Sequence, residues 1–181
     1  GGNAIPVSVD VTDTDSVRAA VADVTGELGD IEVAVNNAGW DDFMPFVKTD
    51  EDFWNKILDI NFKGALRVCH TVVPGMMERG FGRVINIGSD AGRVGSSLEA
   101  VYSGAKGGII AFTKTLAREV ATKGVTVNTV CPGPTDTPLA QANADTWLTF
   151  GADYREETGI AASTPLEQAY PLVFLCSDAA V

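Results

Sequence analysis

The sequence has little positive charge, a single histidine and only three cysteines. Thirteen lysine and arginine residues stand against 24 aspartate and glutamate residues, and the formal net charge is −11. A charge of this sign opposes binding to nucleic acid and to anionic membranes, and no basic run offsets it. We therefore expect neither nucleic acid nor a membrane among the partners of this protein.

The few sulfur and imidazole side chains exclude two further classes. Cys69, Cys131 and Cys176 lie far apart, no CxxC occurs, and His70 falls within a helical pattern. This spacing predicts neither a disulfide framework nor a metal site. The sequence also lacks a signal peptide and an apolar run long enough to span a bilayer, so we expect a cytoplasmic location.

What the sequence does contain is an alternation of strand and helix patterns over 181 residues, of which 45% are hydrophobic. Strands are predicted at 5–11, 31–35, 83–87 and 125–131. Helices are predicted from Thr12 or Asp13 to Gly29, from a capping box at Thr49 and Asp52 to Arg79, at 101–123, and at 165–178 with an interruption at Pro171. This order indicates an α/β domain with a parallel sheet, and we expect one domain over 1–181. Residues 141–163 would form either a mobile lid or a loop and helix on the rim of the sheet.

Polar and glycine-rich stretches follow each predicted strand. They are Asp10–Thr12, Asn36–Gly39, Ser89–Asp90 and Pro132–Thr137. The carboxyl ends of parallel strands meet at one edge, where ligands of such sheets bind. Each stretch alone is also an ordinary turn signal, so the prediction of a site depends on their joint placement.

Tyr102 and Lys106 are four residues apart in a predicted helix, which places both on one face. A nearby ammonium group favours the phenolate and lowers the pKa of a tyrosine from about 10. We therefore expect a lowered pKa for Tyr102, which suits a group that exchanges protons near neutral pH. A tyrosine and a lysine at this spacing are ordinary on their own.

Taken together, these pieces resemble the short-chain dehydrogenase/reductase family. The resemblance covers residues 5–139 and rests on Asp10-Val11, Asn36-Asn37-Ala38-Gly39, Asn61, Ser89, Tyr102-x-x-x-Lys106 and Pro132-Gly133-Pro134-Thr135-Asp136-Thr137. It implies a Rossmann-type doubly wound parallel sheet in three αβα layers. It also implies hydride transfer between a nicotinamide cofactor and a secondary alcohol or ketone, with NAD favoured over NADP.

The resemblance assigns roles to individual residues. Tyr102 would be the acid/base and Ser89 would hydrogen-bond the substrate oxygen. Lys106 would hold the nicotinamide ribose and lower the tyrosine pKa, while Asn61 would position a water that links Lys106 to solvent. The cofactor residues would be Asp10 and Val11 at the adenine, Asn37, Ala38 and Gly39 at the adenosine ribose, and Pro132, Gly133, Thr135 and Thr137 at the nicotinamide carboxamide and phosphates.

Within the family, the stretches at 36–41, 89–97 and 131–137 resemble those of 2-hydroxycyclohexanecarboxyl-CoA dehydrogenases, which oxidise an alicyclic hydroxyacyl-CoA. This would place Trp40, Asp90, Arg93 and Val94 near the substrate, beside Ser89 and Tyr102. Alternatively, Arg93 pairs with an acidic neighbour and Trp40 is a core residue. A sugar or polyol, a 3-oxoacyl thioester or a steroid would be served by the same apparatus.

The sequence departs from the family pattern at both ends. The Thr-Gly-x-x-x-Gly-x-Gly phosphate loop does not occur, and Ser177-Asp178 precedes no final strand. We therefore expect a domain that lacks its first βαβα segment and its last strand, with unpaired strand edges. The missing phosphate loop also leaves open a catalytically silent binding or assembly protein.

Family members usually pair through the helix at 50–79 and the helix after Tyr102, so a homodimer or homotetramer is expected. Gly107, Gly108 and Ala111 would allow close helix approach between subunits, or would equally suit packing on the sheet.

Overall fold

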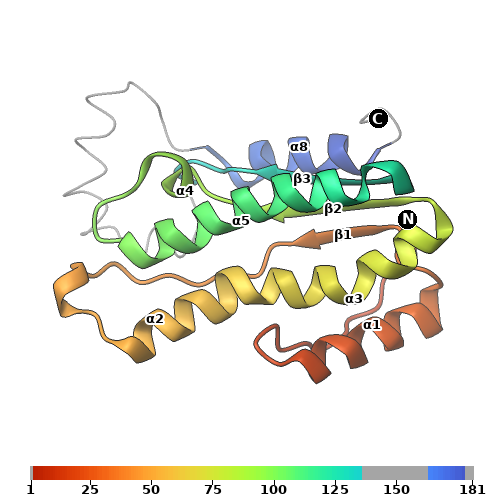
Figure 1. The fold of residues 1–181 in the computed structure, drawn as a ribbon, viewed down its shortest axis with the longest axis horizontal. Helices are drawn as coiled ribbons and strands as arrows, with labels where there is room; N and C mark the ends of the chain where they lie inside the picture. Colours follow the sequence, from red (N-terminus) through yellow and green to blue (C-terminus); the bar gives the residue numbers. More distant parts are fainter. Residues whose placement is uncertain (1, 136–162, 178–181) are drawn as a thin grey trace.

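The computed structural model describes residues 2–135 and 163–177, and places helices on both faces of a parallel sheet (Figure 1). The elements in chain order are α1 (Thr14–Leu28), β1 (Val33–Asn36), η1 (Phe46–Lys48), α2 (Glu51–Leu58), η2 (Asp59–Lys63), α3 (Gly64–Arg79), β2 (Gly82–Ile87), α4 (Ala91–Val94), α5 (Ala100–Val120), η3 (Ala121–Lys123), β3 (Val125–Val130) and α8 (Pro165–Cys176). The residues expected to form a lid, except Ser163, lie outside the described part, as does Thr137.

The sheet has the order β1-β2-β3, and both strand pairs are parallel. Ala34, Val84 and Val127 are in register across the three strands and all three are buried. Helices α3 and α5 cover this face, while α8 lies behind the sheet against β2 and β3 (Figure 1). The arrangement confirms the predicted three-layer α/β fold, because α3 and α5 pack on one face of the sheet and α8 packs on the other. Helices also connect each pair of parallel strands, as such pairs require.

The core lies between the sheet and α3. Val72, Val73 and Met76 of α3 are each at most 6% exposed and pack with valines of β2 and β3. A Cβ at Gly82 would lie 2.6 Å from the side chain of Met76, so only glycine lets the start of β2 approach the helix this closely. Burying each such side chain contributes about 1.5–3 kcal/mol.

The prediction of a strand at 5–11 is wrong. These residues make no ladder in the described part of the chain, and Ile5 and Val9 are 37% and 47% exposed. Their alternating pattern suits a strand, but a strand forms only where a neighbour pairs with its backbone. Near the end of this segment, the Asp10 backbone N–H donates to Ser16 Oγ in α1 at 2.9 Å.

The predicted helix 49–79 contains a feature that its apolar spacing does not reveal. Asp59–Lys63 forms a π-helix between α2 and α3, closed by the bond from the Gly64 N–H to the Asp59 carbonyl. Such single π turns widen a helix by one residue and frequently occur at functional sites. Asn61, one of the expected catalytic residues, lies inside this turn.

Three local predictions on the helices need correction. Asp50, not Thr49, caps α2 by accepting from the Phe53 N–H at 2.9 Å, and Thr49 Oγ1 instead accepts from Trp54 Nε1 at 2.6 Å. Asp13, one of the two candidates, caps α1. Pro171 does not interrupt α8, which runs on to Cys176.

The small residues of α5 pack within the chain. A Cβ at Gly107 would lie 3.3 Å from the Gly92 carbonyl oxygen, and one at Gly108 would lie 3.2 Å from the Phe62 ring. Within the subunit, Gly107 therefore faces α4 and Gly108 faces the π-helix rather than the sheet, and their role in contacts between subunits stays a prediction. None of the helices in the described ranges is long and apolar enough to cross a bilayer.

Candidate active site

The carboxyl ends of the strands gather the predicted residues at one edge of the sheet. Beyond β2 and β3, the Gly88 N–H donates to the Val130 carbonyl at 2.8 Å and the Asp90 N–H to the Pro132 carbonyl at 2.9 Å. These two bonds continue the pairing past the strand ends, so Ser89 lies beside the start of the Pro132 loop. Helix α5 lies in front of the sheet (Figure 1). It carries Tyr102 and Lys106, and Lys106 reaches the end of β2.

Lys106 is buried against the end of the central strand. Its side chain comes from α5, the residue is 4% exposed, and Nζ donates to the Ile87 carbonyl oxygen at 2.9 Å. Burial lowers the pKa of Lys106 to about 8, because removal from water disfavours the ammonium form. One of its three donor positions is used by Ile87, and the others can serve a ligand.

Tyr102 lies one turn before Lys106, whose Nζ is 5.5 Å from the centre of the tyrosine ring. The pKa of Tyr102 is raised to about 12, chiefly by burial; a hydrogen bond from Ser89 lowers it, and the charges of Asp41 and Glu99 raise it further. The expected lowering is wrong for this structure. Burial disfavours the phenolate, and the Lys106 ammonium is directed at the Ile87 carbonyl rather than at the phenol oxygen.

Ser89 connects the β2 end to Tyr102. Its Oγ accepts from the Ala91 N–H at 3.1 Å, which fixes the side chain at the start of α4, and its hydroxyl interacts with the Tyr102 phenol. A carbonyl oxygen placed between the two hydroxyl groups would receive hydrogen bonds from both. The expected pair of Ser89 and Tyr102 is therefore brought together.

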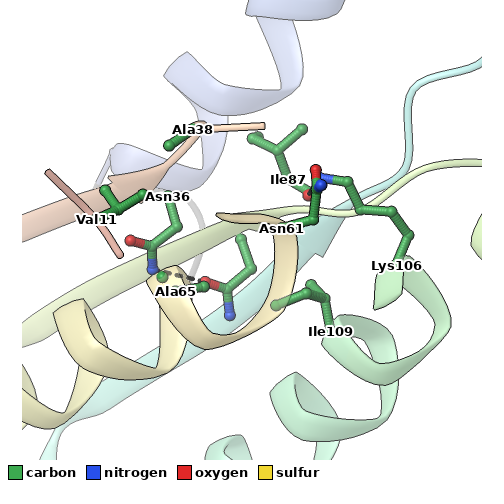
Figure 2. A pocket seen from close by; sticks show the side chains of 10 residues that line it. Val11, Asn36, Ala38, Asn61, Ala65, Ile87, Lys106 and Ile109 are labelled. Carbon is green, nitrogen blue, oxygen red and sulfur yellow. Dashed lines mark hydrogen bonds between the residues drawn. The ribbon is translucent and has the colours of Figure 1, made fainter. Parts of the chain in front are cut away.

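Asn61 is buried in the π-helix and its amide binds the loop after β1. Asn61 Nδ2 donates to the Trp40 carbonyl at 2.6 Å and to the Ile57 carbonyl at 3.0 Å, and Oδ1 accepts from the Trp40 N–H at 3.2 Å. The side-chain amide is thus satisfied by backbone groups. Asn61 and Lys106 point toward one another in Figure 2.

Gly39 lies over the polar groups of Asn61 and Lys106. A Cβ at Gly39 would lie 3.1 Å from Asn61 Oδ1 and 3.7 Å from Lys106 Nζ. The loop after β1 therefore passes directly over both polar groups, and the glycine leaves the space above them open. The donors of the Lys106 ammonium that Ile87 does not use suit hydroxyl acceptors such as those of a ribose.

The expected adenosine residues lie further along the same edge. Asp10 accepts from Thr12 through one carboxylate oxygen, Oδ1, from the N–H at 2.8 Å and from the hydroxyl at 2.7 Å. These bonds lower the pKa of the Asp10 carboxyl, which is fully exposed. Val11 and Ala38 line a cavity that continues to Asn61 and Lys106 (Figure 2). Asn37 is exposed beside them.

The loop after β3 turns back toward α8. Thr135 Oγ1 donates to the Gly133 carbonyl at 3.0 Å, and Thr135 forms an isolated bridge with Ser163, whose N–H donates to the Pro134 carbonyl at 2.9 Å. Pro132 and Gly133 thus lie at the strand edge as expected.

Three of the four residues expected near the substrate beside Ser89 and Tyr102 make other contacts, namely Trp40, Asp90 and Arg93. Trp40 packs edge-on against Phe53, 5.9 Å between ring centres, with Lys56 Nζ 3.5 Å from its ring centre. Arg93 Nη1 lies 3.1 Å from Asp90 Oδ1. This agrees with the alternative that Arg93 pairs with an acidic neighbour. Val94 is 72% exposed.

Sequence reasoning missed a carboxyl pair beside Tyr102. Asp41 and Glu99 line a second cavity with Tyr102, and burial followed by the Glu99 carboxyl raises the pKa of Asp41 to about 8. Asp41 Oδ1 is buried without a hydrogen-bond partner. The two carboxyls are 58 positions apart in sequence, so no spacing could have linked them. The nearest signal was the position of Asp41 just after the Asn-Asn-Ala-Gly stretch.

A buried amide pair beneath the site was also missed. Asn36 Nδ2 donates to Asn86 Oδ1 at 2.8 Å, the dashed line in Figure 2, and Asn86 Nδ2 donates to Thr113 Oγ1 at 2.9 Å. These hydrogen bonds join β1, β2 and α5, and Asn36 and Asn86 line the same cavity as Lys106. A polar residue within an apolar strand, as Asn86 is, was the available signal.

Comparison with known proteins agrees with this geometry. Residues 1–147 match the family described as short chain dehydrogenase. The chain belongs to this family. It is accordingly an NAD(P)-dependent oxidoreductase that acts on alcohol and ketone groups.

Two curated relatives and one solved structure illustrate the likeness. The chain is 37% identical over 180 residues to a 3-oxoacyl-[acyl-carrier-protein] reductase of Vibrio cholerae, covering 99% of this chain and 73% of that protein. It is 39% identical over 171 residues to an acetoacetyl-CoA reductase of Shinella zoogloeoides, covering 94% and 70%. A gluconate 5-dehydrogenase of Burkholderia cenocepacia, solved with NADP and tartrate, superposes with a TM-score of 0.86 at 29% identity, covering 93% and 66%.

Proposed function

We propose that this protein interconverts a secondary alcohol and a ketone with Tyr102 as the proton donor and acceptor. The observation that carries the proposal is the convergence of Tyr102, Ser89 and Lys106 from α5 and β2 on one edge of the sheet. A nicotinamide cofactor bound there supplies the hydride. The protein then supplies placement and the proton.

In the direction of reduction, the Tyr102 hydroxyl gives its proton to the carbonyl oxygen while that carbon gains the hydride, and the alcohol results. A hydroxyl with a raised pKa holds its proton firmly, so the neutral phenol is present at neutral pH. Ser89 donates a second hydrogen bond to the same oxygen and stabilises its developing negative charge. In the reverse direction the phenolate takes the proton back.

Lys106 and Asn61 would bind the cofactor and keep its site in place during this step. The Lys106 ammonium would bind the ribose hydroxyls in the space over which Gly39 passes. Asn61 holds the Trp40 backbone in place and so keeps that space open. We retain the expected role of Asn61 in positioning a water at Lys106 as part of the proposal.

For the substrate we propose a 3-oxoacyl or 3-hydroxyacyl thioester. The names of the Vibrio and Shinella relatives support this class, and both belong to proteins that this chain matches over 94% or more of its length. The alicyclic hydroxyacyl-CoA expected from the sequence is also an acyl thioester and is the second candidate. For the cofactor we propose NADP rather than the NAD that the sequence resemblance favours. The gluconate 5-dehydrogenase of similar structure, which was solved with NADP, supports this choice.

The test is a substrate panel with both cofactors. The intact protein is given NADH or NADPH with acetoacetyl-CoA, 2-oxocyclohexanecarboxyl-CoA or a keto-sugar acid, and nicotinamide absorbance is followed. The proposal expects NADPH-dependent reduction of acetoacetyl-CoA. Turnover of the cyclic thioester alone would move the substrate class to the alicyclic candidate. Absence of binding of either cofactor, measured by calorimetry, would favour the silent binding protein.

We further propose a homodimer or homotetramer located in the cytoplasm, in line with the usual assembly of the family. Sedimentation velocity of the purified protein tests the assembly, and a monomer at all concentrations would exclude it.

A further inference from the structure

Arg67 of α3 reaches from the helix to the expected adenosine wall. Its Nη1 donates to the Val11 carbonyl at 3.1 Å, across 56 positions of sequence, and its side chain is 19% exposed. The wall, residues Asp10–Thr12, forms no strand in the described part of the chain. The Arg67 guanidinium holds this backbone through the Val11 carbonyl, next to the bond from the Asp10 N–H to Ser16 Oγ.

The same guanidinium also binds the start of the π-helix. Nη2 donates to Asp59 Oδ1 at 3.0 Å, and Nη1 approaches the Asp59 carbonyl at 3.4 Å. This carbonyl accepts the bond from the Gly64 N–H that closes the π turn. The carboxyl of Asp59 has a lowered pKa, chiefly because it accepts from Arg67, so this carboxyl is ionised at neutral pH.

The fit between wall and helix is close. A Cβ at Gly64 would lie 3.1 Å from both Val11 Cβ and Cγ2, so Val11 rests on the helix surface beside Arg67. Val11 in turn lines the cavity that leads to Asn61 and Lys106 (Figure 2). The planar fork of an arginine can hold a carbonyl and a carboxylate at once, which a lysine cannot do in the same geometry.

We propose that Arg67 is a positioning residue for the adenosine half of the cofactor. It fixes the Asp10–Thr12 wall to the π-helix that carries Asn61, and thereby sets the distance between the adenosine and the nicotinamide ends of the site. This inference rests on the proposed function, since it requires a dinucleotide in the cavity.

The test compares Arg67→Met with Arg79→Met in the intact protein. Arg79 is a matched control at the far end of α3, where it donates to the Ile31 carbonyl at 2.9 Å and pairs with Asp30 at 3.3 Å. Loss of a hydrogen bond from a charged group corresponds to about a tenfold change in affinity or more. We expect the cofactor KM to rise about tenfold in Arg67→Met, with kcat and the ketone KM within about twofold.

Two half-ligands localise the effect. In calorimetric titration without substrate, ADP-ribose should bind Arg67→Met about tenfold more weakly than wild type, while nicotinamide mononucleotide should bind both equally. Arg67→Lys keeps the positive charge but loses the planar guanidinium, and it should show an intermediate cofactor KM. This variant also allows the test if Arg67→Met does not fold.

The outcomes separate the two proposals. Wild-type protein without turnover of either cofactor contradicts the proposed function itself. Normal wild-type turnover with an unchanged cofactor KM in both Arg67 variants contradicts only the role of Arg67. An equal rise in Arg79→Met, or equal weakening of both half-ligands, would show that helix stability is the cause and would also overturn the role.

Discussion

The Lys106 ammonium donates to the carbonyl oxygen of Ile87 at 2.9 Å, which joins the buried face of α5 to the last residue of the central strand. This bond sets how far the lysine can reach toward a ligand and keeps its charge 5.5 Å from the centre of the Tyr102 ring. The helix and the strand are therefore positioned relative to one another by a residue that is itself part of the candidate site.

Replacing Tyr102 by phenylalanine removes the proposed proton donor and leaves the ring in place. We expect kcat to fall by about 10²–10⁴, the contribution usual for general acid–base catalysis, with cofactor binding retained. Steady-state kinetics and calorimetry measure both effects. Tyr170→Phe on α8, where the side chain is 63% exposed, is the control and should leave kcat unchanged. Full activity of Tyr102→Phe would exclude the proposed mechanism.

The buried Lys106 makes stability depend on pH in a defined window. The pKa of Lys106 is about 10.5 in the unfolded chain and about 8 in the folded protein. Between these pH values the unfolded state therefore binds more protons than the folded state. Stability should therefore rise with pH from about 8 toward 10, above which the raised pKa of Tyr102 begins to oppose it.

Urea unfolding at several pH values measures this slope in wild type and in Lys106→Met. The variant should lose the rise. Lys114→Met, at an exposed position of the same helix, should keep it, and a variant at Lys106 with an unaltered slope would contradict the buried ammonium.

Asp41 should give the opposite dependence. Its pKa is about 3.8 when unfolded and about 8 when folded, so its contribution is present at low pH and is lost as the pH rises toward 8. Asp41→Asn should remove this decline, which thermal unfolding between pH 4 and 8 would reveal. Asp42→Asn, at the exposed neighbour, should retain it.

The same variant tests the electrostatics at Tyr102. The charges of Asp41 and Glu99 both raise the pKa of Tyr102. Asp41→Asn should therefore shift the rise of alcohol oxidation with pH to lower values, since phenolate forms more readily. An identical pH–rate profile in wild type and variant would contradict this link.

Gly39→Ala should obstruct the space in front of Lys106. The new Cβ would lie 3.1 Å from Asn61 Oδ1 and 3.7 Å from Lys106 Nζ, closer to the amide oxygen than most Cβ contacts. We expect weaker cofactor binding, by about tenfold, because overpacking of this kind costs about 1–3 kcal/mol.

Gly26→Ala is the comparison for Gly39→Ala. Nothing lies within 4 Å of a Cβ at Gly26 in α1, so alanine there should stabilise the helix by up to about 1 kcal/mol and leave binding unchanged. Calorimetric titration with the cofactor decides the first variant, and denaturant unfolding decides the second. Unimpaired binding by Gly39→Ala would place the ribose elsewhere.

Periodicity and glycine stop signals predicted the sheet and most helices. Strands 33–36, 82–87 and 125–130 are rich in valine and isoleucine, and glycine ends α1 and precedes β3. Periodicity failed at 5–11, where an alternating pattern found no partner strand in the described residues. It also failed to reveal the π turn at Asp59–Lys63, since a single inserted residue hardly disturbs the spacing of apolar side chains.

The candidate site divides in the same way. Tyr102, Lys106, Ser89 and Asn61 were accessible from the sequence because their spacing and neighbours form a recognisable pattern, and their roles stay predictions. Asp41 with Glu99, Asn36 with Asn86, and Arg67 with Val11 were not accessible, because each pair lies in separate elements.

The sequence by itself therefore determined the order of most elements and the α/β class, and it supplied the candidate residues of the site. These depend on local periodicity and on short spacings. Only the tertiary structure decided the pKa directions and the packing of Gly107 and Gly108, which depend on what other elements place nearby. It decided in the same way that Trp40 packs on α2. Burial, above all, reversed the expected shift at Tyr102, since the cost of removing a phenolate from water depends on packing that no short stretch of sequence encodes.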